Sequence, residues 1–293
     1  MDPVLIIGSM TVDIILRIHH LPKQKEDLVI HSSKMQLGGC AYNIANVFHC
    51  AHYPYRFISA IGNGLYGNFI KEQLKKQGYH HRLFVKEEHG CCYCLVDASG
   101  ERTFLAQHGA EYCFRKEWMN PYKNEKFSYV YVCGLDIEEK GGQEIIEYLA
   151  ELDTPILFAP GSRWMHIATE KMEKILKMHP ILHLNEEEAM AMSESKNIEE
   201  ALEKWYSRTQ NTVIITRGEK GCVMKDQKEI LYVKGRSRQV KDTIGAGDTH
   251  AAAFLLRRCQ QASLKDALEY ANEMAGRVVE REGSLISKRD FES

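Results

Sequence analysis

The sequence predicts an α/β fold in which a mainly parallel central sheet is covered by helices on both faces. Short apolar runs of strand length alternate along the chain with segments of helical periodicity. This alternation is typical of parallel sheets, because a crossover must return the chain before the next parallel strand can begin. The chain has 293 residues, of which 44% are apolar, so it can bury one principal core.

The expected strands of the main sheet are short and continuously apolar, as strands buried on both faces must be. They are residues 4–7, 55–61, 129–133, 156–158, 181–184 and 213–216. Helical spacing of apolar residues predicts the intervening helices, at residues 41–50, 67–77, 143–152, 169–178 and 198–208. A further buried helix is expected directly after the small-residue turn that ends at residue 248.

Two stretches break this alternation. Residues 14–36 contain strand-like pieces with no helix between them, and residues 91–105 are typical of a hairpin with its turn at 97–100. Together they predict a small β-sheet. The pattern fits a separate sheet that would serve as a lid and an edge extension of the main sheet equally well.

Charge and composition argue against several classes of function. The formal net charge is −2, from 38 basic and 40 acidic residues, which gives no electrostatic reason to expect nucleic-acid or membrane binding. No apolar run is long enough to span a membrane, and the first residues lack a signal-peptide pattern, so we expect a cytoplasmic protein. No G-x-G-x-x-G follows the first strand, which argues against a dinucleotide-dependent oxidoreductase.

The nine cysteines do not follow a metal-binding pattern. Cys91, Cys92 and Cys94 lie in one expected strand, where successive side chains alternate between faces, and no Cys or His pair at zinc spacing accompanies them. We therefore expect free thiols, packed in a protein of a reducing compartment.

The most informative run is Asp-Thr-Ile-Gly-Ala-Gly-Asp at residues 242–248, directly before an expected buried helix. Gly245 and Gly247 let the backbone approach a ligand closely, and the free N–H groups of a helix N-terminus suit an anion. Asp248 at that helix start would serve as a base that takes a proton from a hydroxyl. An aspartate N-cap behind a glycine turn is the alternative.

Two further elements offer groups that suit a sugar. Gly38 and Gly39 precede a helix that carries Asn43, whose amide both donates and accepts hydrogen bonds. Asp13 follows the first strand, at the carboxyl end of the sheet where ligands of open α/β sheets gather, and it can accept bonds from two neighbouring hydroxyls. An ordinary strand-to-helix turn and a turn aspartate are the structural alternatives.

The run at 242–248 resembles the signature D-T-x-G-A-G-D of the PfkB, or ribokinase-like, family of carbohydrate and nucleoside kinases, and the resemblance extends over nearly the whole chain. It implies a single ribokinase-like kinase domain over residues 1–293. Its fold would be a three-layer αβα sandwich, with a lid formed by about residues 13–37 and 91–107 inserted into the α/β core. The implied reaction is ATP-dependent phosphorylation of a sugar or nucleoside hydroxyl, and a homodimer through the lid is implied as an option.

The resemblance assigns roles residue by residue. Asp248 would be the catalytic base, and the amides of residues 245–248 would form an anion hole, with Gly245, Ala246 and Gly247 contributing. The acceptor sugar would be bound by Asp13, Gly38, Gly39 and Asn43. The nucleotide would be bound by Asn185, Thr216, Gly218, Gly221 and Asn272, although Asn185 also suits a helix cap and Asn272 a helix surface.

Two cations are implied as well. Glu188, in the N-x-x-E motif that begins at Asn185, would hold Mg²⁺ through water, which suits an ion that sheds its water reluctantly. A monovalent cation, K⁺, would be ringed by oxygens of four residues, which are Asp242, Ile244, Gly283 and Ser287.

Departures from the family pattern bear on the acceptor. Residues 158–164 carry Ala159 and Gly161 where many sugar kinases read Asp and Asn, which argues against a close fructokinase. Few basic residues are placed to bind a phosphorylated sugar, so we expect a non-phosphorylated sugar of the ribokinase or fructokinase type. The alternative is a nucleoside kinase of the adenosine or pseudouridine type, with Tyr42 and Tyr112 as residues that would stack a base. Glu111 would lie near the acceptor or in a solvated loop. A silent sugar or nucleotide sensor is a further reading, which the intact motif disfavours.

Overall fold

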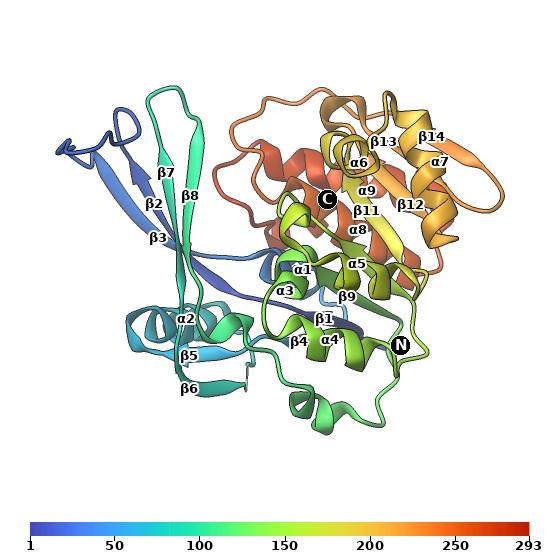
Figure 1. Ribbon diagram of the computed structural model, residues 1–293, viewed down its shortest axis with the longest axis horizontal. Coiled ribbons are helices and arrows are strands. Elements are labelled where there is room, and N and C mark those ends of the chain that lie inside the picture. Colours follow the sequence, from blue (N-terminus) through green and yellow to red (C-terminus); the bar gives the residue numbers. More distant parts are fainter. Residues whose placement is uncertain (82, 293) are drawn as a thin grey trace.

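The computed structural model describes residues 1–81 and 83–292, which form a layered α/β core with a second β-sheet standing beside it (Figure 1). The main sheet has eight strands in the order β14-β13-β12-β11-β10-β9-β1-β4. Neighbours from β12 to β4 pair in parallel, whereas β13 and β14 are antiparallel. Along the chain these strands are β1 (Val4–Ile7), β4 (Tyr55–Ile58), β9 (Tyr129–Cys133), β10 (Ile156–Ala159), β11 (Ile181–Asn185), β12 (Val213–Thr216), β13 (Cys222–Lys225) and β14 (Ile230–Val233).

Helices cover both faces of this sheet, and the alternation of each strand decides which residue faces which layer. In β1, Leu5 and Ile7 join one apolar cluster, while Val4 and Ile6 join the other. The first cluster contains apolar residues of α4 (Gly142–Leu149), α5 (Thr169–Leu176) and α7 (Ile198–Thr209). The second contains those of α1 (Cys40–Cys50), α8 (Ala246–Cys259) and α9 (Leu264–Val279). The result is the three-layer sandwich that the sequence predicts.

The second sheet is separate from the first and has the strand order β3-β2-β7-β8 (Figure 1). It consists of β2 (Thr11–Arg17), β3 (Ser32–Gly38), β7 (Cys91–Val96) and β8 (Arg102–Gln107). β3 pairs with β2 and β8 pairs with β7, both antiparallel, and the two central strands β2 and β7 pair in parallel. A third apolar cluster joins this sheet to α2 (Gly64–Gln77). The expected small sheet is therefore confirmed, and it is not an edge extension of the main sheet.

The expected strand at residues 55–61 is wrong in its extent. β4 ends at Ile58, and Ile61 begins β5 (Ile61–Asn63), which pairs with β6 (Phe84–Glu88) in a sheet of its own. The break lies at Ser59, whose hydroxyl accepts a hydrogen bond from the backbone N–H of Met10 at 2.9 Å. The short helix α3 (Gly134–Glu138) was not predicted, whereas α6 (Glu186–Ser193) is the helix that Asn185 was expected to cap.

In the described part of the chain, no helix combines the length and the apolar character that crossing a bilayer demands. Over the same residues, no group of three or more His, Cys, Asp or Glu side chains is arranged to hold a metal ion directly. Cys91 and Cys94 are buried on β7, and Cys92 is half-buried.

The turn that leads into α1 depends on glycine for reasons of packing. Gly39, the N-cap residue, has φ +97° and ψ 136°, a conformation that side chains with a Cβ atom rarely adopt. A Cβ atom at Gly39 would lie 2.7 Å from the backbone oxygen of Ser9, and one at Gly38 would lie 2.1 Å from Oδ2 of Asp13. The space that both glycines leave is thus filled by the protein itself.

Gly39→Ala should destabilise the fold far more than Gly64→Ala. Both glycines have positive φ, which costs an alanine roughly 1–2 kcal/mol, but only Gly39 has atoms within 4 Å of the added Cβ. The clash should add about 1–3 kcal/mol, so we expect a total loss of about 3 kcal/mol against about 1 kcal/mol for the control. Urea denaturation of both variants measures the difference, and equal losses would contradict the packing argument.

Candidate active site

Asp248 lies in the first turn of α8, where the backbone N–H groups lack partners within the helix. The helix can start there because Gly245, its N-cap, has φ +76°, and a Cβ at this position would lie 2.5 Å from the backbone oxygen of Ser284. Burial raises the pKa of Asp248 to about 6, although hydrogen bonds from Asn43 and Cys40 oppose the shift. A carboxylate whose pKa lies just below neutrality suits a general base.

Asn43 connects this carboxylate to the C-terminal segment. Its amide Nδ2 donates to Oδ2 of Asp248 at 2.7 Å, and its Oδ1 accepts from the hydroxyl of Ser284 at 2.9 Å. The side chain is 6% exposed, so both bonds form away from bulk water. Asn43, which was predicted to bind the sugar, and Asp248, the predicted base, are therefore in direct contact.

Asp13 lies on β2 and is placed against the glycine turn. It accepts a hydrogen bond from the hydroxyl of Thr11 at 3.2 Å, and its carboxylate fills the space beside Gly38. Burial raises its pKa to about 6, with the Thr11 bond acting in the opposite direction. The structure thus brings Asp13 together with Gly38 and Gly39, and Asn43 follows one helical turn later.

A pocket of about 250 Å³ opens beside the N-terminus of α8. Four of the residues predicted to bind the nucleotide line it, namely Thr216, Gly218, Gly221 and Asn272, together with Ala246 and Gly247 of the turn that was predicted to bind an anion. A Cβ atom at Gly218 or Gly247 would meet no atom within 4 Å, so these glycines leave open space. Asn185, which was also predicted to bind the nucleotide, is not among the described residues that line the pocket.

Asn272 is held by a buried histidine pair that the sequence did not reveal. Nε2 of His250 lies 3.2 Å from Oδ1 of Asn272, and Nδ1 of His250 lies 2.9 Å from Nε2 of His183. Since the Asn272 amide nitrogen donates to the backbone oxygen of Val233, its Oδ1 must accept, which assigns the proton to Nε2 of His250. Burial lowers the pKa of both imidazoles, to about 4 for His250.

Asn185 and Glu188 form a reciprocal cap at the start of α6, as the structural alternative requires. The backbone N–H of Glu188 donates to Asn185 Oδ1 at 2.7 Å, and the Asn185 N–H donates to Glu188 Oε2 at 3.1 Å. Burial raises the pKa of Glu188, and the charges of Glu187 and Asp248 raise it further. The Glu188 carboxylate is an oxygen ligand of the kind that Mg²⁺ accepts through water.

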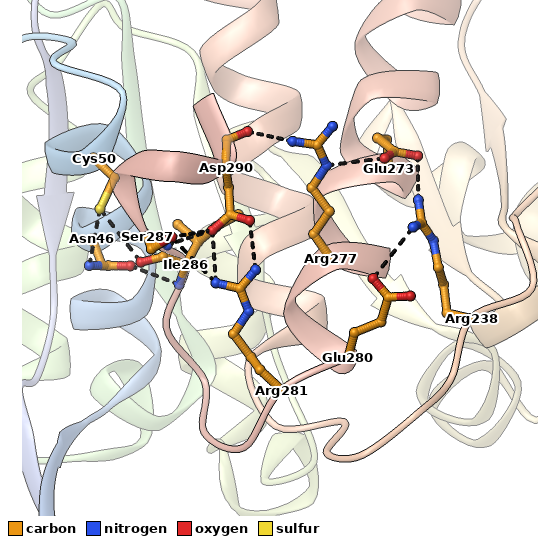
Figure 2. A network of polar contacts seen from close by, with 10 residues as sticks. All are labelled: Asn46, Cys50, Arg238, Glu273, Arg277, Glu280, Arg281, Ile286, Ser287 and Asp290. Atoms are coloured by element: carbon orange, nitrogen blue, oxygen red, sulfur yellow. Dashed lines mark hydrogen bonds and ion pairs between the residues drawn. The ribbon is translucent and has the colours of Figure 1, made fainter. Parts of the chain in front are cut away.

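Three of the four residues expected around a monovalent cation are in contact with one another. Oδ1 of Asp242 accepts from the N–H of Ile244 at 2.9 Å, and Oδ2 accepts from the N–H of Gly283 at 3.0 Å. Ser287 belongs to a different network, shown in Figure 2, in which its hydroxyl donates to Asp290 at 2.7 Å. Oδ1 of Asp242 also pairs with the guanidinium of Arg102, at 2.8 Å.

Several other expectations are corrected. Glu111 is not a solvated loop residue, because it is 4% exposed and accepts hydrogen bonds from the backbone of Gly90 and Gly109. Tyr42 is fully buried and donates to Gln77, and Tyr112 is buried as well, so neither presents a ring face to a ligand. The interaction of Cys40, the first residue of α1, with Asp248 was missed, since nothing in a lone cysteine indicates it.

A family model described as "pfkB family carbohydrate kinase" matches residues 1–290. The uncharacterized sugar kinase YegV of Escherichia coli is 27% identical over 286 residues, which are 96% of this chain and 89% of that protein.

Solved structures share the fold over the whole chain. Arabidopsis thaliana ribokinase, determined with ribose and ATP, has a TM-score of 0.82 and 22% identity, with 99% of this chain and 98% of that chain covered. The nucleoside kinase of Methanocaldococcus jannaschii has a TM-score of 0.82 and 20% identity, with 99% and 97% covered.

The buried histidine pair should make the fold sensitive to mild acid. The pKa of His250 is about 4 in the folded chain against an ordinary value of 6.5, so the unfolded chain binds the proton first and stability is lost as pH falls from 6.5 towards 4. His250 alone should cost about 2 kcal/mol between pH 7 and pH 5. Urea unfolding at both pH values measures this loss. A His183→Leu/His250→Phe double variant should lose less between the two pH values, and an unchanged pH dependence would contradict the assignment.

Proposed function

Because the chain belongs to the pfkB family of carbohydrate kinases, we propose that it transfers the γ-phosphoryl group of ATP to a hydroxyl of a non-phosphorylated sugar. The observation that carries the proposal is the position of Asp248. It lies between the acceptor residue Asn43, 2.7 Å away, and the glycine-lined pocket beside the N-terminus of α8. A base, an acceptor element and an anion-binding turn thus meet at one point.

On the acceptor side, Asp13 and Asn43 would hold neighbouring sugar hydroxyls, and Asp248 would accept the proton of the attacking one. Asn43 also orients the carboxylate, since its Nδ2 donates a hydrogen bond to Oδ2. The attacking hydroxyl is then held within hydrogen-bond reach of its base and aligned with the phosphorus, which is most of what phosphoryl transfer requires. We expect a primary hydroxyl, the least hindered nucleophile on a sugar.

On the nucleotide side, the amides at the N-terminus of α8 would bind the phosphoryl group that is transferred. Gly247 lets the phosphoryl group come close to these amides, because it has no side chain and the space that a Cβ atom would occupy has no neighbour within 4 Å. Thr216, Gly218, Gly221 and Asn272 would line the rest of the ATP site. Magnesium, held through water by Glu188, would supply positive charge to the phosphates when bound.

The choice of a sugar over a nucleoside rests on the buried aromatic residues. Tyr42 and Tyr112, which would stack a base, belong to the core. The choice of a non-phosphorylated acceptor gains support from Arg102, because its guanidinium is engaged by Asp242. A nucleoside acceptor is the second candidate, and the observation in its favour is the match to the Methanocaldococcus jannaschii nucleoside kinase over 99% of this chain.

The proposal is tested by measuring ADP release from Mg-ATP with a pool of free sugars and, separately, with a pool of nucleosides. We expect ADP release that depends on the sugar pool, and splitting that pool then identifies the acceptor. Release with the nucleosides alone would establish the second candidate instead. No acceptor-dependent release from either pool would contradict both.

Asp248 should determine the acid limb of the activity. A base must be ionised, so kcat/KM should fall about tenfold per pH unit below the pKa of about 6 and level off above it. Asp248→Asn should lower turnover about a hundredfold or more, because the amide accepts no proton. The thermal melt of the variant shows whether the fold is intact, and a folded variant with near-normal turnover would refute the base assignment.

A further inference from the structure

An ion pair joins the second sheet to the loop that precedes α8. Arg102, the first residue of β8, places its guanidinium Nη1 2.8 Å from Oδ1 of Asp242, a residue 140 positions later in the chain. The two side chains are 26% and 8% exposed. A pair of this burial differs from ordinary surface pairs, because removing one partner would leave a carboxylate buried without its counter-charge.

The Asp242 carboxylate is a hub for two segments of the site. One oxygen accepts from the N–H of Ile244, which directly precedes the N-cap Gly245 of the anion-binding turn. The other accepts from the N–H of Gly283, whose neighbour Ser284 donates to Asn43. The position of this one carboxylate therefore affects both the turn before α8 and the segment that supports Asn43.

The same residues were expected to ring a monovalent cation, and two of the required oxygens are already engaged by cationic side chains. Arg102 contacts Asp242, while Ser287 donates to Asp290 and lies 3.5 Å from a guanidinium nitrogen of Arg281 (Figure 2). Asp290 in turn holds that guanidinium at 2.6 Å. This donor set does not fit a free K⁺ ion.

We propose that Arg102 is a positioning residue that acts as a built-in cation, so that closure of the second sheet completes the phosphate-binding turn without K⁺. The guanidinium supplies the positive charge at Asp242 and fixes the carboxylate against Ile244 and Gly283. Because Arg102 belongs to the second sheet, this charge is present only when that sheet lies over the core. The inference rests on the proposed kinase function and on the use of the sheet as a lid.

The chain offers a matched control in Arg17. It lies on β2 of the same sheet and pairs with Glu282, next to Gly283, but at 3.8 Å and with side chains that are 54% and 75% exposed. An exposed pair at this distance contributes little. Arg17→Ala thus removes one positive charge from the same sheet, facing the same segment, without touching Asp242.

The experiment compares Arg102→Ala, Arg102→Lys, Arg17→Ala and Asp242→Asn with the unaltered protein, in potassium chloride and in tetramethylammonium chloride at equal ionic strength. The unaltered protein and Arg17→Ala should have the same kcat in both salts. Arg102→Ala should lose about tenfold or more in kcat in tetramethylammonium and recover part of it in potassium, because the vacated position then accepts the ion. Arg102→Lys should retain more activity than Arg102→Ala, and Asp242→Asn should not be rescued by potassium.

A second readout does not depend on turnover. Potassium should raise the melting temperature of Arg102→Ala, relative to tetramethylammonium, and should leave that of the unaltered protein unchanged. This shift is observable even if no tested acceptor is phosphorylated, so failure of the proposed function and failure of this inference are distinguishable. The inference is overturned if the unaltered protein requires potassium, or if Arg102→Ala behaves like Arg17→Ala in both measurements.

Discussion

The hydrogen bond between Asn43 and Asp248 is the contact on which the arrangement of the site depends. It joins α1 to α8 across 205 positions of sequence. Both helices bury apolar residues in one cluster against the same face of the main sheet, which brings their N-terminal ends together. Packing of this kind leaves small rotations and shifts possible, but a buried bond from an amide to a carboxylate does not tolerate them. The second bond of Asn43, from Ser284, adds the C-terminal segment to the same fixed point.

The glycines of the site serve two different purposes, which the sequence motif does not separate. At Gly39 and Gly245 a Cβ atom would collide with backbone oxygens, and both residues have positive φ, so the fold itself requires glycine there. At Gly247 an added Cβ would meet no neighbour within 4 Å and φ is not positive, so neither packing nor backbone conformation explains the absence of a side chain. Gly218 has the same open space but a φ of +56°, and both residues line the pocket beside α8. The glycines of the motif are therefore partly a folding requirement and partly a means of leaving the pocket open.

The sequence predicts what local patterns encode. Continuous apolar strands and amphipathic helices gave the parallel sheet, and the run at 242–248 placed Asp248 at a helix start. The contacts that were missed depend on long-range geometry. Alternation along β8 shows which face of the sheet Arg102 occupies, but not that Asp242 lies opposite. His183 lies within an apolar strand, and its partner His250 is 67 residues further along the chain. The break after Ile58 depends on a bond to Ser59 from Met10, in the segment between β1 and β2, which no local pattern reveals.

If the second sheet closes over the site as we propose, the balance of charge would couple its closure to the assembly of the turn before α8. Burial already raises the pKa of Asp13, Asp248 and Glu188, and the negative charge of Asp248 raises the pKa of Glu188 further. Excluding more water would push these groups towards protonation, yet a base must stay ionised to act. Covering Asp242 without a partner would add another buried negative charge next to the amides that we propose bind phosphate. Because Arg102, the residue that pairs with Asp242, belongs to the second sheet, the proposed closure of that sheet would avoid this penalty.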